Sequence, residues 1–359
     1  MAAELGGRRV MIVTDPGILA AGHVTRGVNA LEAAGLTVGL FHDVAENPTT
    51  AHVDAGVAFA RDFAPDLIVG FGGGSSMDCA KGINFLITNG GAIRDYWGIG
   101  KATKPLLPMI AVPTTAGTGS EAQSFALISD ADTHVKMACG DKKASFRTAV
   151  LDPTLTVTQP SRVTALTGVD ALSHAVESYV TLTRNAASSL FAGRAFELLA
   201  KNLPLVLNEP ENLAARGAMQ VGACFAGLAI ENGMLGAAHA LANPLTAEFG
   251  IVHGQAIGLV LPAVVRFNGA HVDELYRSLL AVARTSGDLP AASGGAAAMS
   301  DFLTMRIAQS GLKTKLHECD VPRDVLPRLA ADAATQWTAK HNPRPVETAD
   351  LLSIYEAAW

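Results

Sequence analysis

The spacing of apolar residues changes near residue 160, and this change constrains the fold more than any other feature of the chain. Before it, short β-branched runs such as RRVMIVTD, LTVGLFHD and DLIVGFGGG alternate with helical segments. After it, apolar residues recur at helical spacing in long segments such as VTALTGVDALSHAVESYVT. Alternating strands and helices are typical of βαβ units in a mostly parallel sheet. The sequence therefore predicts an α/β domain with a parallel sheet over residues 1–158 and an all-helical domain over residues 159–359.

Three local predictions belong to this plan. The segment GILAAGHVTRGVNALEAAG predicts one helix over residues 17–35, closed by Gly35, because glycine is common just after a helix. ALISDADTHVKMACG and TAVLDP predict further strands over residues 126–140 and 148–153. LPAASGGAAAMS, rich in glycine and serine, predicts a loop over residues 289–300.

The composition narrows the classes of protein that fit this plan. Of the 359 residues, 49% are hydrophobic and 17% are charged, so the chain can bury large cores. The net charge is −6 and the basic residues are scattered, which argues against nucleic acid as a partner. No apolar run reaches the roughly 18 residues of a membrane span. The best candidate, residues 256–265, is short and contains Pro262.

The cysteines and the first residues indicate a reducing compartment. The four cysteines lie far apart without CxxC spacing, which argues against a disulfide framework and against a thiolate zinc site. The opening segment MAAELGGRRVMIVTD lacks the long apolar core of a signal peptide. We therefore expect a cytoplasmic protein that does not associate with membranes.

Two glycine-containing loops follow neighbouring predicted strands. In LIVGFGGGSSMD, the glycines allow close backbone approach, and the next helix offers free N–H groups that suit a pyrophosphate. The pattern GxGxxG is only partly met, since Ser75 stands at its last position, so this turn alone fits a phosphate site and a plain turn about equally. VPTTAGTGSE adds hydroxyls and glycines after the next strand. Because doubly wound sheets bind ligands at the carboxyl ends of their strands, the pair favours a nucleotide site.

A second set of residues predicts a metal site in the helical domain. Asp170 and His174 in GVDALSHAVES are four residues apart, which places them on one face of a helix. His239 and His253 add two imidazoles in otherwise apolar surroundings, where unpaired polar groups are costly. One carboxylate and three imidazoles form a ligand set for a divalent first-row metal. We favour this interpretation over one in which each of the four side chains has its own hydrogen-bond partner in the core.

Taken together, these segments resemble the iron-containing (group III) alcohol dehydrogenase family over nearly the whole chain. The segments that carry the resemblance are GGGSSMDCAK, PTTAGTGSE, LDPTLT, GVDALSHAVES, HALANPL, HG at residues 253–254, and HNPRP. The resemblance implies the fold shared with dehydroquinate synthase-like proteins. In that fold an N-terminal dinucleotide-binding domain and a C-terminal helical domain enclose the active site between them.

The resemblance also implies the chemistry and the residues that carry it. The activity is the reversible, NAD(P)-linked oxidation of a small primary alcohol to its aldehyde, with a divalent metal as Lewis acid. The implied metal ligands are Asp170, His174, His239 and His253. Iron is the metal of the family, and the donor set leaves Zn²⁺ open. The cofactor-binding residues are expected to be Asp15, His42, Asp43, Gly72, Gly73, Gly74, Ser75, Asp78, Thr114, Thr115, Thr118 and Lys136.

Two positions depart from the family pattern. The second histidine of the family's HxxxH motif, which lies near substrate and nicotinamide, is Asn243 here. An amide can form hydrogen bonds there but cannot carry a proton near neutral pH. We therefore expect Asn243 to be a catalytic residue that does not relay a proton as the family's histidine can. NAD-dependent members commonly carry an aspartate where His42 stands, and Asp43 comes one residue later. Asp43 favours NAD, whereas a protonated His42 would admit NADP.

Two other functions compete with the dehydrogenase. A dehydroquinate synthase-like lyase also uses NAD and a metal, but it returns the hydride to its substrate and needs clustered lysines and arginines for a phosphorylated sugar acid. A nucleotide-binding regulator would have no use for four metal-ligand side chains. The resemblance favours the dehydrogenase, acting on a small alcohol or aldehyde and assembled as a homodimer or larger homo-oligomer.

Overall fold

The computed structural model describes residues 1–133, 135–284 and 295–359, which form two compact units. The first unit comprises residues Met1–Thr115 and Ser120–Thr158, and the second comprises Ala116–Gly119 and Gln159–Trp359. The short segment Ala116–Gly119 thus leaves the first unit, and the chain returns to it at Ser120.

A five-stranded parallel sheet forms the centre of the first unit, with strand order β2-β1-β3-β5-β8. The strands are β1 (Arg9–Val13), β2 (Thr37–Phe41), β3 (Leu67–Gly72), β5 (Met109–Pro113) and β8 (Thr148–Ala149). Val13 pairs with Phe41 and with Gly70, and Gly72 pairs with Pro113. The carboxyl ends of β1, β2, β3 and β5 therefore lie along one edge, as predicted from the alternating strands and helices.

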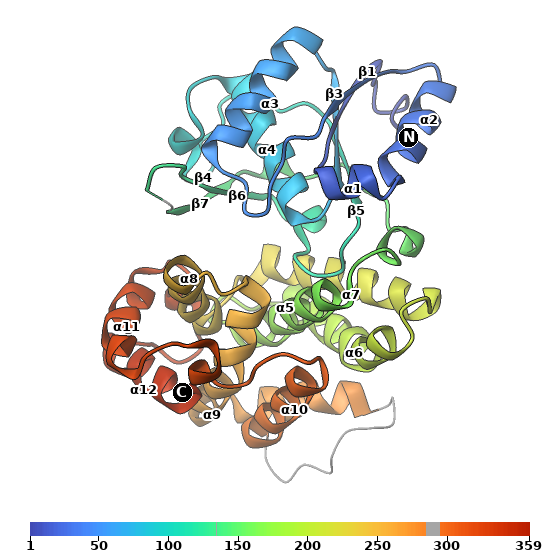
Figure 1. Ribbon diagram of the computed structural model, residues 1–359. Helices are drawn as coiled ribbons and strands as arrows, with labels where there is room; N and C mark the ends of the chain where they lie inside the picture. Colours follow the sequence, from blue (N-terminus) through green and yellow to red (C-terminus); the bar gives the residue numbers. More distant parts are fainter. Residues whose placement is uncertain (134, 285–294) are drawn as a thin grey trace. The chain divides into compact units, whose positions relative to one another are not determined.

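Helices cover both faces of this sheet, and alternate residues of each strand point to opposite sides. In β1, Met11 and Val13 pack in a core with α3 (Thr50–Phe63) and α4 (Gly74–Asn89), while Val10 and Ile12 face the opposite side. That side is covered by α1 (Pro16–Ala20) and α2 (His23–Ala33), as Figure 1 shows. Burial on both faces explains why these strands are almost continuously apolar.

The structure corrects the prediction of one helix over residues 17–35. The chain forms α1, then turns at Gly22 and starts α2 at His23. Gly22 has a φ of 78°, a left-handed conformation that glycine adopts without steric cost and that a continuous helix excludes.

The additional strands build a small second sheet in the first unit. Its order is β4-β7-β6, formed by Gly98–Ile99, Lys136–Gly140 and Phe125–Ser129. β6 and β7 pair in antiparallel fashion, and β8 instead joins the main sheet. The strands predicted after residue 126 are therefore present but are divided between two sheets.

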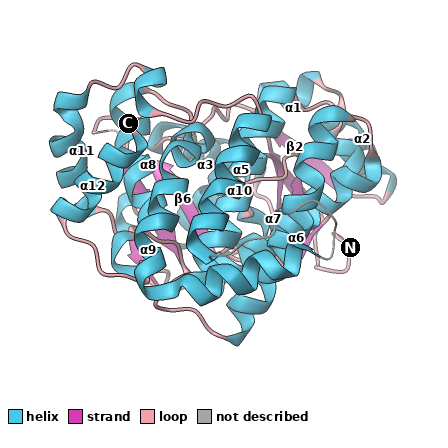
Figure 2. Cartoon of the chain, turned by 90° about the horizontal axis from the view of Figure 1, so that it is seen from below, coloured by secondary structure: helices cyan, strands magenta, loops and turns pink. Residues whose placement is uncertain are grey.

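The described part of the second unit contains helices and turns. The helices are α5 (Ser161–Val180), α6 (Ala186–Asn208), α7 (Leu213–Gly233), α8 (Ala237–Phe249), α9 (His253–Arg284), α10 (Gly295–Gln309), α11 (Leu326–Thr335) and α12 (Thr348–Ala358). They pack around one large apolar core. Figure 2 shows these helices from below. The family fold expected from the sequence, a parallel-sheet region followed by a helical one, is confirmed.

Two details of the helical unit differ from the sequence predictions. Residues 295–300, predicted as loop, form the first turns of α10, while residues 289–294 of that prediction lie outside the described residues. Among the described helices, α7 is long and apolar enough to cross a membrane, although the sequence had pointed to residues 256–265 as the best candidate. Of its most apolar window, 56% is buried inside the protein, as in a core helix.

Candidate metal centre and cofactor edge

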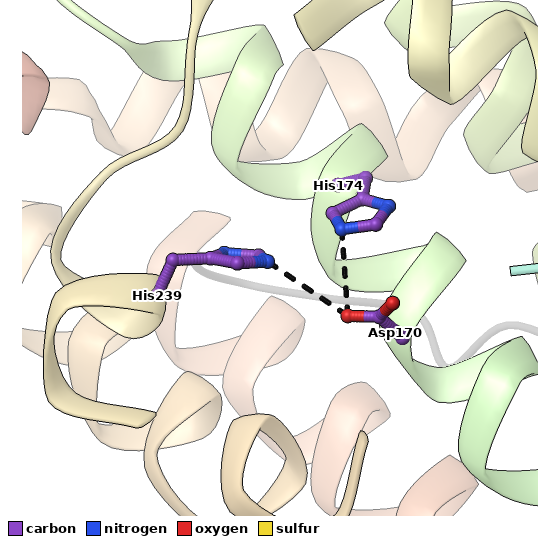
Figure 3. A group of neighbouring side chains, drawn as sticks. All are labelled: Asp170, His174 and His239. Atoms are coloured by element: carbon purple, nitrogen blue, oxygen red, sulfur yellow. Dashed lines mark ion pairs between the residues drawn. The ribbon is translucent and has the colours of Figure 1, made fainter. Parts of the chain in front are cut away.

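Asp170 and His174 project from the same face of α5, as their spacing predicts. His174 Nε2 lies 3.4 Å from Asp170 Oδ1, and both side chains are buried. The helix around them is buried for most of its length, so the two polar groups sit in an apolar environment. Figure 3 shows them facing His239, which reaches toward them from a different helix.

The two remaining histidines come from α8 and α9 and converge on the same carboxylate oxygen. His239 Nε2 lies 3.8 Å and His253 Nε2 lies 3.7 Å from Asp170 Oδ1. The side chain of His253 is 28% exposed, against 9% or less for the other three residues of the cluster. The structure thus brings all four predicted ligands together and leaves His253 the one most open to solvent.

The donor atoms of this cluster suit a divalent metal. Asp170 Oδ1 and His239 Nε2 are buried and make no hydrogen bond within the described residues. The donor atoms of Asp170, His174 and His239 all lie within 4.8 Å of one another. In a tetrahedral site, two ligand atoms that each lie about 2.1 Å from the ion are about 3.4 Å from each other. The distances of 3.4, 3.8 and 3.7 Å from the three histidine Nε2 atoms to Asp170 Oδ1 are close to this value. A cation would therefore satisfy buried atoms that have no hydrogen-bond partner in the described part of the chain.

The electrostatics of the cluster favour positive charge at its centre. Burial alone would raise the pKa of Asp170, but the facing histidines, His174 first, lower it below its ordinary value. Burial likewise would lower the pKa of His239, but the carboxylates of Asp170 and Glu177 raise it to about 9. Burial dominates for His174 and lowers its pKa. The Asp170 carboxylate therefore stays ionised beside the imidazoles.

Glu177 is a site residue that the sequence analysis missed. Its Oε2 accepts a hydrogen bond from His239 Nδ1 at 2.5 Å, and its Oε1 accepts one from the Ala238 N–H at 2.8 Å. A signal was present, because Glu177 follows Asp170 and His174 at seven and three residues and so shares their helix face.

The HNPRP segment anchors the helix that carries His239. Asn342 Oδ1 accepts hydrogen bonds from the Ala237 N–H at 3.3 Å and from Asn268 Nδ2 at 3.1 Å. Asn342 Nδ2 donates to Asn268 Oδ1 at 2.7 Å and to the Arg344 carbonyl at 2.6 Å. A residue near the end of the chain thereby satisfies one of the N–H groups at the start of α8, which the helix itself leaves unpaired.

Asn243 lies one helical turn beyond His239 on α8. Its Nδ2 donates a hydrogen bond to Gln336 Oε1 at 3.0 Å, and both residues are half-buried. A neutral amide pair therefore stands where the family pattern has a histidine, and neither of its members titrates near neutral pH.

Most of the predicted cofactor residues follow the carboxyl ends of adjacent strands in the first unit. Asp15 comes after β1, His42 and Asp43 after β2, Gly72–Ser75 at the end of β3, and Thr114 and Thr115 after β5. β1 lies between β2 and β3 in the sheet. The connection from β1 to β2 runs over one face of the sheet, and the connection from β2 to β3 runs over the other face. The order in which strands are added to the sheet therefore reverses beside β1. Open α/β sheets bind ligands at such a switch point.

The glycine turn is closely packed against its neighbours at this edge. Gly72 has a φ of 153°, and a Cβ there would lie 2.4 Å from Ser76 Oγ. Ser76 Oγ in turn donates to Asp15 Oδ2 at 3.2 Å, which links the ends of β1 and β3. The N-terminus of α4 follows at once, so its free N–H groups face the edge where a pyrophosphate is expected.

The loop after β2 contains a close contact between a histidine and an aspartate, and it reaches the second sheet. His42 Nδ1 lies 3.2 Å from Asp43 Oδ1, and both side chains are exposed. Lys136, at the start of β7, donates to Asn47 Oδ1 in this loop at 3.4 Å. Lys136 is therefore near the segment that holds the predicted ribose-binding residues.

The threonines of the loop after β5 differ in burial and in the unit to which they belong. The Thr114 hydroxyl is buried and has no hydrogen-bond partner within the described chain, whereas Thr115 is half-buried. Thr118 belongs to the second unit, so the structure does not group it with the other cofactor candidates.

Asp78 is enclosed rather than open at the edge of the sheet. Its Oδ1 accepts a hydrogen bond from Ser120 Oγ at 2.5 Å and lies 3.6 Å from Nζ of the fully buried Lys81. Its Oδ2 accepts from the Leu127 N–H at 3.3 Å. Asp78 therefore ties α4 to the Ser120 turn, and a direct contact with the pyrophosphate stays a prediction.

Glu121 gives a prediction about pH dependence in the first unit. Burial raises the pKa of this carboxyl from 4.5 to about 7. The folded state then holds a proton that the unfolded state has lost, so stability should fall as the pH rises from about 4.5 to about 7. Glu121→Gln removes this titration and should be more stable than the wild type at pH 8 by about 3 kcal/mol, with no difference at pH 4. Urea denaturation of both proteins across this range measures the difference, and parallel pH curves would contradict it.

Comparison with known proteins agrees with this geometry. The family model described as iron-containing alcohol dehydrogenase matches residues 1–153, and that of the C-terminal domain of the Fe-containing alcohol dehydrogenase family matches residues 164–359. NAD-dependent methanol dehydrogenase of Bacillus methanolicus is 33% identical over 99% of this chain and 93% of its own. Alcohol dehydrogenase 4 of Schizosaccharomyces pombe is 41% identical over 73% of this chain, which spans 62% of that protein.

A solved structure extends the likeness to three dimensions. Sulfoacetaldehyde reductase from Bifidobacterium kashiwanohense, solved in complex with NAD⁺, superposes with a TM-score of 0.87 at 28% identity, over 99% of this chain and 92% of that one. The chain belongs to the iron-containing alcohol dehydrogenase family. The enzyme class expected from the sequence, an NAD(P)-linked alcohol dehydrogenase of the iron-containing type, is confirmed at the level of this family.

Proposed function

We propose that this chain reversibly oxidises a small primary alcohol to its aldehyde, with NAD as cofactor and a divalent metal, Fe²⁺ or Zn²⁺, in the second unit. The observation that carries the proposal is the convergence of three imidazole Nε2 atoms within 3.8 Å of one buried carboxylate oxygen. When bound, the metal supplies a Lewis acid and the nicotinamide supplies the hydride chemistry.

The residues of the chain have distinct tasks in this proposal. Asp170, His174, His239 and His253 hold the metal, and residues 159–359 bind the substrate. Residues 1–158 bind the dinucleotide, with the glycine turn and the N-terminus of α4 at the pyrophosphate and with Asp15, Thr114 and Thr115 beside it. Asp78, Thr118 and Lys136 also belong to the predicted cofactor set, as do His42 and Asp43 in the loop after β2. The unpartnered Thr114 hydroxyl supports a polar ligand at this edge.

The choice between NAD and NADP depends on the loop after β2. A 2′-phosphate needs an uncompensated positive charge, but His42 lies 3.2 Å from the Asp43 carboxylate. That carboxylate both offsets a charge on His42 and repels a phosphate, which supports NAD.

A panel of aldehydes and alcohols tests the proposed activity. The protein is loaded with Fe(II) or Zn(II) under anaerobic conditions and mixed with each aldehyde and NADH or NADPH, while absorbance at 340 nm is followed. Steady loss of NADH absorbance, larger than that of NADPH, is expected. Absence of any change with every aldehyde overturns the proposal, and would leave the dehydroquinate synthase-like lyase, which causes no net oxidation of the cofactor, as the alternative.

Asn243→His tests the role proposed for Asn243 beside the substrate. The new imidazole carries a proton in the range near pH 6.5, which the amide pair with Gln336 cannot. We expect kcat or the preference among aldehydes to change by about tenfold or more, with a new pH-dependent limb in this range. Steady-state kinetics of both proteins from pH 5.5 to 9 are the measurement, and superimposable profiles would show that Asn243 does not face the substrate.

The remaining parts of the proposal concern location and assembly. We propose a soluble cytoplasmic enzyme that works as a homodimer or larger homo-oligomer and has no nucleic-acid or membrane partner. The acidic net charge of −6 argues against a nucleic-acid partner, and the partly buried position of α7 argues against a membrane span. Light scattering on a sizing column would measure the assembly.

A further inference from the structure

One buried carboxylate outside the ligand set is placed to decide how His239 presents itself to a metal. We infer that Glu177 is a positioning residue that keeps the proton of the His239 ring on Nδ1, so that the Nε2 lone pair faces the metal. This inference rests on the proposed metal-dependent function, because it concerns the same site.

The contact between the two side chains determines the position of the proton. Glu177 is 3% exposed, and its Oε2 lies 2.5 Å from His239 Nδ1. The other oxygen of this carboxylate already accepts from the Ala238 N–H, and a carboxylate that accepts at both oxygens leaves Nδ1 as the donor of this contact. The other ring nitrogen, Nε2, is buried without a hydrogen bond within the described residues and lies 3.8 Å from Asp170 Oδ1. Nε2 is therefore the atom left for a metal.

Glu177 also holds the backbone that carries this ring. Its second oxygen, Oε1, accepts from the Ala238 N–H at 2.8 Å, in the first turn of α8. Both oxygens thus act as acceptors, one for the ring and one for the peptide next to it. Carboxylate partners of this kind commonly fix the tautomer and orientation of metal-binding histidines.

A glutamine at this position has the same shape, but it cannot accept hydrogen bonds from both His239 Nδ1 and the Ala238 N–H. An amide has one acceptor oxygen and one donor NH₂ group. If the oxygen faces the Ala238 N–H, the NH₂ group faces Nδ1 and moves the ring proton to Nε2, where the metal should bind. If the amide flips, its NH₂ group faces the Ala238 N–H instead. The first orientation loses the proton position that frees Nε2, and the second removes the acceptor of the Ala238 N–H and places two donors against each other, although little volume changes.

Glu177→Gln is therefore the test, with Glu197→Gln as the matched control. Glu197, on α6, is half-buried and pairs with Arg194 at 2.5 Å, so its replacement makes the same change of charge elsewhere. Zn(II) affinity is measured by competition with a chelator, and the Co(II)-loaded proteins are compared by visible absorption. We expect Glu177→Gln to weaken Zn(II) binding about 10–100-fold and to change the Co(II) spectrum. Glu197→Gln should match the wild type in both.

The outcomes separate this inference from the proposed function. If the wild-type protein binds neither metal, the proposed function fails. If the wild type binds and Glu177→Gln binds within about threefold of it, the inference about Glu177 fails. A lowered thermal stability of metal-free Glu177→Gln with an unchanged Co(II) spectrum would show that Glu177 only anchors α8, and would equally overturn the inference.

A measurement on the wild type covers the case in which Glu177→Gln does not fold. In the Zn(II)-loaded protein labelled with ¹⁵N-histidine, nuclear magnetic resonance should find the His239 proton on Nδ1. A proton on Nε2, or none on Nδ1, would overturn the inference without any variant at Glu177.

Discussion

Replacement of His239 with alanine is expected to abolish tight metal binding and to lower turnover by at least about 10³-fold, equivalent to about 4 kcal/mol of lost transition-state stabilisation. The physical reason is that His239 Nε2 is one of the three histidine nitrogens within 3.8 Å of Asp170 Oδ1. Its loss leaves three ligands, one of which, His253, is 28% exposed. Elemental analysis after dialysis and steady-state kinetics are the measurements.

His271→Ala is the matched control for this prediction. His271 is an exposed histidine of α9, the helix that also carries His253. It is not one of the four proposed metal ligands. It should keep wild-type metal content and turnover. A His239→Ala protein that retains one metal ion per chain and full turnover would remove His239 from the proposed ligand set.

Gly254→Ala is expected to destabilise the helical unit by about 3 kcal/mol and to weaken metal binding. Gly254 is the second residue of α9, directly after His253, and a Cβ there would lie 2.2 Å from the Leu166 carbonyl oxygen of α5. The obstacle is backbone on a buried helix, so the two helices must separate. His253 and Asp170, which these two helices carry, would then separate as well.

Gly258→Ala provides a control one turn further along the same helix. Its added Cβ would lie 3.4 Å from Ile307 Cγ2, an ordinary contact with a flexible side chain. Because alanine favours helices over glycine by about 1 kcal/mol, this variant should be at least as stable as the wild type. Urea denaturation and Zn(II) titration compare the three proteins, and indistinguishable behaviour of Gly254→Ala and Gly258→Ala would contradict the prediction.

The parts of the site that were predicted from sequence depend on local regularities. Asp170 and His174 share a helix face because the α-helix repeats every 3.6 residues. Asp15, Gly72 and Thr114 reach one edge because parallel strands end on the same side of a sheet. Glu177 follows the same helical rule and could have been found by extending the pattern one turn. The break at Gly22 was missed because glycine is also tolerated inside a helix, at a cost that packing can offset.

Other features depend on contacts between residues far apart in the chain. No spacing shows that Glu177 meets His239, 62 residues away, or that Asn342 holds Ala237, 105 residues away. The short contact that requires Gly254 exists only because α9 crosses α5 there.

The amino-acid sequence by itself therefore determined the family, the order of strands and helices, and which side chains share a helix face or a strand end, since backbone hydrogen bonding repeats over a few residues. Tertiary packing alone decided that α5, α8 and α9 bring three imidazoles to one oxygen atom of Asp170, and which nitrogen of His239 is free. The reason is that burial and helix contacts depend on all the segments that pack together. Whether a buried polar atom has a hydrogen-bond partner is decided only once those segments are packed.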